Sequence, residues 1–116
     1  MNLRKEMESY MKYLDAWDKK IAMWGASHQG FTLAATTKLG DKAQYIIDSA
    51  PFKHGKFAPS SHLPIVPPEY FLDHPVDAII ITAPGYTEEI AASIRERFGK
   101  DVEVRAMRFN HLELVG

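Results

Sequence analysis

The stretch that decides the fold reads Ile21-Ala22-Met23-Trp24-Gly25-Ala26-Ser27-His28-Gln29-Gly30. Its first four residues form an apolar run, and a short apolar run that meets a glycine is typical of a buried strand. Apolar residues then recur at helical spacing from Phe31 to Leu39, which predicts a helix that ends near Gly40. The stretch therefore predicts a strand, a glycine turn and a helix.

Further strands and helices alternate along the rest of the chain. Apolar runs and alternating patterns predict strands at 43–48, 63–66, 76–83 and 102–107, with helices starting near 67 and 87. Strands that alternate with helices pair in parallel through right-handed crossovers. The sequence therefore predicts a small Rossmann-like α/β domain with three α/β/α layers. We expect about five mostly parallel strands in the order 3-2-1-4-5.

The first part of the chain has a helical period of its own. Apolar side chains recur at spacings of three and four, at Leu3, Met7, Tyr10, Met11, Leu14 and Trp17. This pattern predicts an N-terminal amphipathic helix in residues 1–18, and Trp17 and Trp24 are most simply core residues. We expect residues 1–116 to form one domain, with the α/β core in 19–116.

Composition excludes several classes of function. Of 116 residues, 46% are hydrophobic, and 14 Lys and Arg against 15 Asp and Glu leave no basic excess for nucleic-acid binding. Because there is no cysteine, disulfides and thiolate metal sites are excluded, and the five histidines form no His-x3-His pair. We expect no metal, no membrane segment, no signal peptide and a cytoplasmic location.

The turn from Gly25 to Gly30 is the first candidate site. At a helix N-terminus, free backbone N–H groups and the helix dipole favour an anion. The spacing Gly-x-Ser-x-x-Gly is a degenerate dinucleotide fingerprint, in which Ser27 replaces the middle glycine and has a hydroxyl to donate. The same residues also suit a turn that only packs the helix on the strand, with His28 as an ordinary helix-start residue.

Two further candidates follow the second strand. Asp48 stands where dinucleotide-binding sheets place a ribose-binding acid, although an aspartate before Ser-x-Pro is also typical of a turn cap. The long connection that follows carries cations and hydroxyls suited to a phosphate clamp: Lys53, His54, Lys56, Ser60, Ser61 and His62. A solvated loop held by prolines explains the same composition.

The strongest predicted strand, 76–83, leads into Pro84, Gly85 and Tyr86. In the predicted sheet, the strand order reverses between this strand and the one at 21–24. Sheets of this type bind ligands beyond the carboxyl ends of the strands at such a point. Tyr86 is therefore placed either to stack on a base or sugar or to pack against the next helix.

One long pattern is more specific than the glycine turn. It reads Asp48-x-x-Pro51-x-Lys53-x-Gly55-Lys56-x-x-Pro59-x-x-His62-x-Pro64-Ile65 and is followed by Pro68-Glu69. With the turn at 25–30 and the segment 84–90, it resembles the C-terminal domain of bacterial S-adenosylmethionine-dependent C-methyltransferases that act on nucleotide-linked deoxysugars. The resemblance covers nearly the whole chain.

The resemblance implies a domain that helps to hold a nucleotide-sugar or another phosphorylated small molecule, with no catalytic residue of its own. It implies no cofactor bound by this domain, because S-adenosylmethionine belongs to a methyltransferase domain, which would be the partner in cis or in trans. The predicted substrate-binding residues are Gly25, Ala26, Ser27, His28, Gly30, Asp48, Lys53, Lys56, Ser60, His62, Pro84 and Tyr86.

Two alternatives stay open at this stage. One is an NAD- or coenzyme-A-type nucleotide-binding module, which the incomplete glycine fingerprint disfavours. The other is a structural or interaction domain without a ligand, whose first helix docks a partner through its methionines and aromatic residues.

Overall fold

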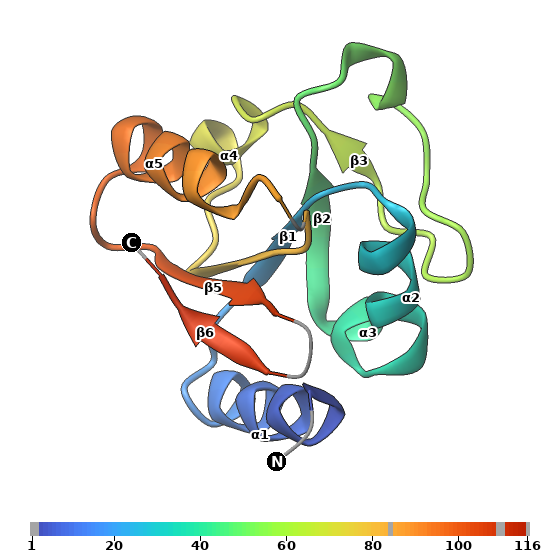
Figure 1. Cartoon of the computed structure of the whole chain (residues 1–116), viewed down its shortest axis with the longest axis vertical. Helices are drawn as coiled ribbons and strands as arrows, with labels where there is room; N and C mark the ends of the chain where they lie inside the picture. Colours follow the sequence, from blue (N-terminus) through green and yellow to red (C-terminus); the bar gives the residue numbers. More distant parts are fainter. Residues whose placement is uncertain (1–2, 84, 109–110, 116) are drawn as a thin grey trace.

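The sheet at the centre of the molecule has six strands in the order β3-β2-β1-β4-β5-β6 (Figure 1). The structure is a computed structural model that describes residues 3–83, 85–108 and 111–115. The strands are β1 (Ile21–Trp24), β2 (Ala43–Ile47), β3 (Ile65–Val66), β4 (Ala78–Ile81), β5 (Glu103–Met107) and β6 (Leu112–Leu114). The helices are α1 (Leu3–Ala16), α2 (His28–Thr36), α3 (Leu39–Lys42), α4 (Tyr70–Asp73) and α5 (Thr87–Phe98), with a 3-10 turn, η1 (Pro51–Lys53).

Strand order is confirmed for the first five strands, which pair in parallel as 3-2-1-4-5. The prediction of about five strands misses β6, which pairs antiparallel to β5 and makes the sheet mixed. This strand has three residues, of which Glu113 and Leu114 are exposed, so it lacks the apolar run that marks a strand in the sequence. Its hairpin with β5 holds it in place.

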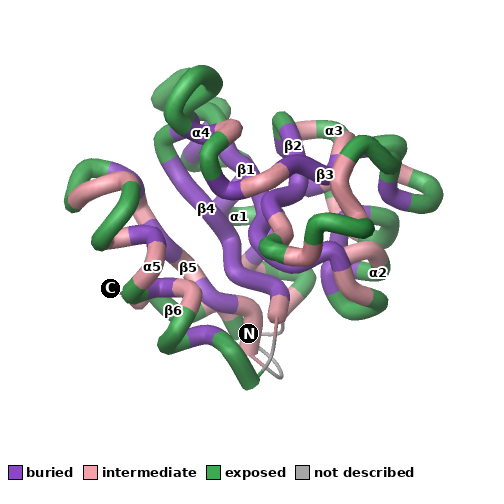
Figure 2. Tube along the Cα trace, turned by 90° about the horizontal axis from the view of Figure 1, so that it is seen from above, coloured by how far each residue is buried: buried purple, intermediate pink, exposed green. Residues whose placement is uncertain are grey.

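Helices cover both faces of the sheet and give the predicted three layers. The core beneath α1, α2 and α3 includes Met7, Leu14, Met23, Leu33, Ile46 and Ile80. The core beneath α4 and α5 includes Trp24, Ile47, Phe71, Ile79, Ile94 and Val104. Figure 2 shows β1 and β4 buried along their lengths, because their side chains point alternately into the two cores.

The central strands end level with one another. β1 and β4 pair in register over all four residues, and β1 also ends level with β2. The next residues, Gly25, Asp48 and Thr82, therefore meet at one side of the sheet, its carboxyl edge. The ladder continues there, because the Gly25 N–H donates to the Ile47 carbonyl at 2.8 Å and the Thr82 N–H donates to the Trp24 carbonyl at 2.9 Å.

Two glycines let the turn after β1 lie against the end of β4. Gly25 has a φ of +129°, which L side chains rarely adopt. A Cβ on Gly30 would lie 2.6 Å from the Gly25 carbonyl oxygen and 2.7 Å from the Thr82 hydroxyl oxygen, closer than real Cβ contacts come. The buried Thr82 hydroxyl donates to the Gly25 carbonyl at 3.1 Å. Close packing, as well as backbone freedom, therefore requires glycine here.

The first helix covers the sheet of its own chain. Met7, Met11 and Leu14 are buried, and the hydroxyl of Tyr10 donates to the carboxylate of Glu103 on β5. This hydrogen bond links the helix to a strand that comes 93 residues later in the chain. No helix among the described residues combines the length and apolar composition that crossing a bilayer requires.

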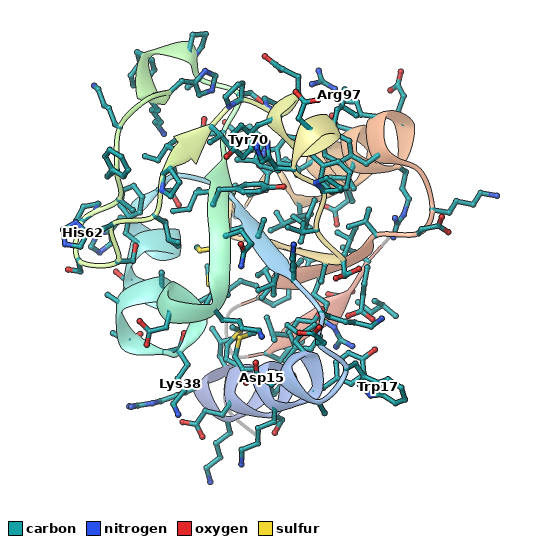
Figure 3. All side chains as sticks on the ribbon, turned by 180° about the vertical axis from the view of Figure 1, so that it is seen from behind. Asp15, Trp17, Lys38, His62, Tyr70 and Arg97 are labelled. Carbon is teal, nitrogen blue, oxygen red and sulfur yellow. The ribbon has the colours of Figure 1, made fainter. Side chains whose placement is uncertain are left out.

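The two tryptophans differ in their surroundings. Trp24 is buried in β1 as predicted, whereas the predicted core position of Trp17 is wrong. α1 ends at Ala16, so the turn that follows directs the Trp17 side chain away from the sheet, and it is 69% exposed (Figure 3). Helical periodicity predicts burial only for residues within the helix.

We predict that Gly30→Ala destabilises the domain by about 1–3 kcal/mol, because the new methyl group has no room beside Gly25 and Thr82. Urea unfolding followed by circular dichroism measures this loss. Gln29→Ala is the matched control, since Gln29 is exposed on the same helix and should change stability by less than about 0.5 kcal/mol. Equal midpoints for the two variants would contradict the packing argument.

We also predict that the free energy of unfolding falls as the pH rises above about 10. Burial, the hydrogen bond to Glu103 and the charge of Glu103 raise the pKa of Tyr10 above its ordinary value. Native Tyr10 therefore keeps its proton at pH values where the unfolded chain has lost it, so stability declines with pH. Tyr10→Phe should make the decline shallower in urea titrations, and an unchanged pH dependence in this variant would contradict the assignment to Tyr10.

Candidate functional site

A cavity of about 520 Å³ opens at the carboxyl edge, between β1, β2, β4 and α5. We call it the switch-point cavity, because the strand order reverses between β1 and β4 at this place. Its lining residues are Trp24, Gly25, Ser27, Asp48, Ser49, Ala50, Lys53, Ala83, Tyr86, Glu89, Ile90 and Ser93. The volume lies in the range of small-molecule sites.

Ser27 is the N-cap residue of α2 and lines the cavity. Its side-chain oxygen accepts from the Gly30 N–H at 3.4 Å, as N-cap serines do, and its hydroxyl donates to the Thr82 carbonyl at 3.1 Å. The hydroxyl that sequence reasoning offered to a phosphate is therefore used inside the protein. Its donation joins α2 to the end of β4.

Asp48 connects two walls of the cavity. Its carboxylate oxygens accept from the Ala26 N–H and the Ala50 N–H, each at 2.9 Å. The Lys53 ammonium lies 3.5 Å from the carboxylate and donates to the Ala26 carbonyl at 2.8 Å. The His54 ring nitrogen Nε2 lies 2.5 Å from the Asp48 carbonyl oxygen. Asp48 thus caps the turn after β2. This is the second of the two roles that its sequence context suggested, the first being ribose binding.

Lys53 is the cation among the described lining residues, opposite two carboxylates, Asp48 and Glu89. An ammonium has three N–H donors, and Ala26 and Asp48 account for two of them. Its side chain is 33% exposed, so the third can reach a ligand. The cavity is therefore not strongly cationic. Among the described residues, no group of three His, Asp or Glu side chains converges to hold a metal ion.

Tyr86 lies at the cavity, just before α5, and 65% of it is exposed. The sequence left open whether the Tyr86 ring packs against the next helix or stays available for a ligand. In the structure the ring is exposed and is not packed beneath the helix. A free aromatic face beside a cavity is available for stacking on a planar ring. Pro84, also predicted for the site, lies outside the described residues.

The long loop does not bring all its predicted residues to the cavity. After Lys53 it doubles back along β3: the Gly55 N–H donates to the Ile65 carbonyl at 3.1 Å, and the Ile65 N–H donates to the Lys56 carbonyl at 2.9 Å. Lys56, Ser60 and His62 are exposed and do not line the cavity. Figure 3 shows His62 at the outer margin of the molecule.

The remaining predicted residues have different surroundings. Ala26 contributes its backbone N–H and carbonyl to Asp48 and Lys53, and Gly30 is buried beneath the turn. His28 is exposed and faces a second cavity, on the α2 side of the edge. The structure therefore groups Gly25, Ser27, Asp48, Lys53 and Tyr86 around one space.

Sequence reasoning missed the wall that α5 contributes. Glu89 and Ser93 lie four residues apart, so they share one face of the helix and line the cavity. Their sequence signal is weak, because polar residues at this spacing are ordinary on a solvated helix face. The turn residue Ser49 was also missed.

We predict that Asp48→Asn destabilises the domain by about 1–3 kcal/mol, because one of the two oxygens that accept from a backbone N–H becomes an NH2 group and the charge that pairs with Lys53 is lost. Urea midpoints and the amide shifts of Ala26 and Ala50 report the loss. Asp73→Asn, at an exposed carboxylate of α4, is the control and should behave as the parent chain. An unperturbed Ala26 amide in Asp48→Asn would show that this link is unimportant.

Known structures resemble the fold. UDP-D-quinovosamine 4-dehydrogenase from Vibrio fischeri aligns with a TM-score of 0.64 at 19% identity, covering 84% of this chain and 93% of that one. RSP, a Rex-family repressor, aligns with a TM-score of 0.58 at 16% identity, covering 90% of this chain and 60% of that one. At these identities the likeness concerns the architecture, and it supports the Rossmann-like assignment.

Sequence comparison identifies the family. The C-methyltransferase NovU from Streptomyces niveus is 30% identical over 95 residues, which cover 81% of this chain and 23% of that protein. The chain thus spans about a quarter of the length of this relative. The family model described as "C-methyltransferase C-terminal domain" matches residues 1–104 and confirms the resemblance found in the sequence. The chain belongs to the family of C-methyltransferase C-terminal domains.

Proposed function

We propose that this domain holds a nucleotide-linked deoxysugar for a methyltransferase domain, and that the switch-point cavity binds the nucleotide. The observation that carries the proposal is the set of groups around this cavity: the free ring of Tyr86, the Asp48–Lys53 pair and the hydroxyls of Ser49 and Ser93. These groups match an aromatic base and a hydroxyl-bearing sugar. The methyltransferase domain, in cis or in trans, supplies S-adenosylmethionine and the methyl-transfer chemistry.

Each group has a distinct part in binding. The Tyr86 ring stacks on the base, while the third N–H of Lys53 donates to a ligand oxygen. Phosphate oxygens lie near the start of α2, where the first N–H groups of a helix lack intrahelical partners. Because the cavity has two carboxylates for one lysine, stacking and hydrogen bonding supply more of the affinity than charge does.

An NAD-type site is less compatible with the same geometry. Asp48 stands where an NAD-binding sheet has the acid that binds the ribose hydroxyls. Its carboxylate already accepts from the Ala26 and Ala50 N–H groups and is paired with Lys53. A deoxynucleotide-linked sugar has no 2′-hydroxyl that would need this carboxylate, so it is more compatible with the cavity than NAD.

A ligand-free interaction domain is also less compatible. That alternative relies on the apolar face of α1, but Met7, Met11 and Leu14 are buried in this chain's own core. The name of the aligned Vibrio fischeri dehydrogenase refers to a UDP-linked sugar, which accords with a sugar-nucleotide ligand on this architecture. We place the function in the cytoplasm, as the sequence predicts.

Titration of the ¹⁵N-labelled chain with deoxythymidine diphosphate (dTDP) tests the proposal. We expect the amide shifts to change at Gly25 to Gly30, at Ser49 to Lys53 and around Tyr86. Lys56 and His62, which lie outside the cavity, should stay unchanged. Absence of shifts around the cavity at millimolar dTDP would refute nucleotide binding there.

We predict that Tyr86→Ala weakens dTDP binding about tenfold, because loss of stacking on a base costs about 1–3 kcal/mol. The ring is largely exposed, so the variant should unfold at the same urea concentration as the parent chain. Phe57→Ala is the control, since Phe57 is 66% exposed but does not line the cavity. Equal dissociation constants for the two variants would exclude Tyr86 as the stacking residue.

A further inference from the structure

A second cavity, of about 670 Å³, lies on the α2 side of the carboxyl edge. We call it the α2-side cavity. Its lining residues are Leu3, His28, Gln29, Thr32, Leu33, Thr36, Gly85, Met107 and Arg108. Four elements thus contribute to it: α1, α2, the turn after β4 and the end of β5.

The two cavities lie on either side of one ridge. Ser27 lines the switch-point cavity, and the next residue, His28, lines the α2-side cavity. The turn after β4 also contributes to both cavities: Ala83 and Tyr86 line the switch-point cavity, and Gly85 lines the α2-side cavity. Because residues next to one another in these two turns line different cavities, a ligand that crosses this ridge reaches both.

The chemistry of the α2-side cavity differs from that of its neighbour. Leu33 and Met107 give it apolar surface, and Thr32 and Thr36 lie four residues apart on the same face of α2. The Thr36 hydroxyl donates to the Thr32 carbonyl at 2.7 Å, which leaves its oxygen able to accept from a ligand. None of the described lining residues is a carboxylate.

From this juxtaposition we infer that the ligand occupies both cavities, with its nucleoside in the switch-point cavity and its sugar in the α2-side cavity. The inference rests on the proposed function and assigns a subsite to each half of the ligand. The free Tyr86 ring favours the base on its own side. A deoxysugar has apolar faces and few hydroxyls, which match apolar side chains with two threonine hydroxyls.

The groups that line each cavity indicate which half of the ligand it binds. In the α2-side cavity, Arg108 is engaged by Glu88 at 3.3 Å and Glu113 at 2.7 Å, so this cation is part of a surface network. The cavity presents neutral hydrogen-bonding groups and apolar surface instead. The linking phosphates of a nucleotide-sugar then cross the ridge at Ser27 and His28.

Two ligands that differ only in the hexose test the inference on the full 116-residue chain. dTDP should shift the amides of Ser49, Tyr86 and Ser93, whereas dTDP-6-deoxyglucose should also shift those of Thr32 and Thr36. Thr36→Phe fills the second cavity from an exposed helix position, so we predict about tenfold weaker binding of dTDP-6-deoxyglucose. The dissociation constant of dTDP should stay within about twofold.

Ala35→Phe is the matched control, because Ala35 is exposed on the same helix but does not line the cavity. It should change neither dissociation constant. If dTDP binds but the hexose adds shifts only around the switch-point cavity, or if Thr36→Phe weakens both ligands equally, the two-cavity inference is overturned alone. If neither ligand shifts residues of the carboxyl edge, the proposed function fails and the inference fails with it.

Discussion

The contact between the turn after β1 and the end of β4 is the constraint on which the rest of this structure depends. The Thr82 hydroxyl donates to the Gly25 carbonyl, and the absence of a side chain at Gly30 lets α2 start directly against both. Because β1 and β4 are neighbours in the sheet and lead to helices on opposite faces, this contact sets the width of the crevice between α2 and α5. The switch-point cavity has a wall on α5, and the α2-side cavity has a wall on α2.

Asp48 shows how a position common in nucleotide-binding sheets can acquire a structural use. Its carboxylate joins the turn after β1 to the turn after β2, and Lys53 completes the link through the Ala26 carbonyl. A partly buried carboxylate with three partners holds its position well, but a ligand hydroxyl would have to compete with those partners. The same bonds that position the cavity walls therefore reduce the capacity of this acid to select a ribose.

Much of the fold follows from the sequence, because strands covered on both faces need long apolar runs. The runs at 21–24 and 78–81 are the two central strands, and their order was predictable from the alternation of strands and helices. β6 was not predictable, since a three-residue edge strand has no burial to impose a pattern. The predicted burial of Trp17 was wrong because the helical spacing of apolar residues in the sequence extends beyond Ala16, where α1 ends.

The site was less predictable, and the loop between β2 and β3 explains why. Its first part, η1, builds a wall of the cavity, whereas the part after Lys53 covers the outer edge of β3 with backbone hydrogen bonds. An unpaired edge strand would be a template for aggregation. Much of this loop, whose composition suggested a phosphate clamp, therefore serves to hydrogen-bond the outer edge of β3. Ser60 and His62 turn it with positive φ values, a conformation that residues other than glycine rarely adopt. Composition therefore did not tell which residues of this loop line the switch-point cavity, because that depends on where the chain reverses.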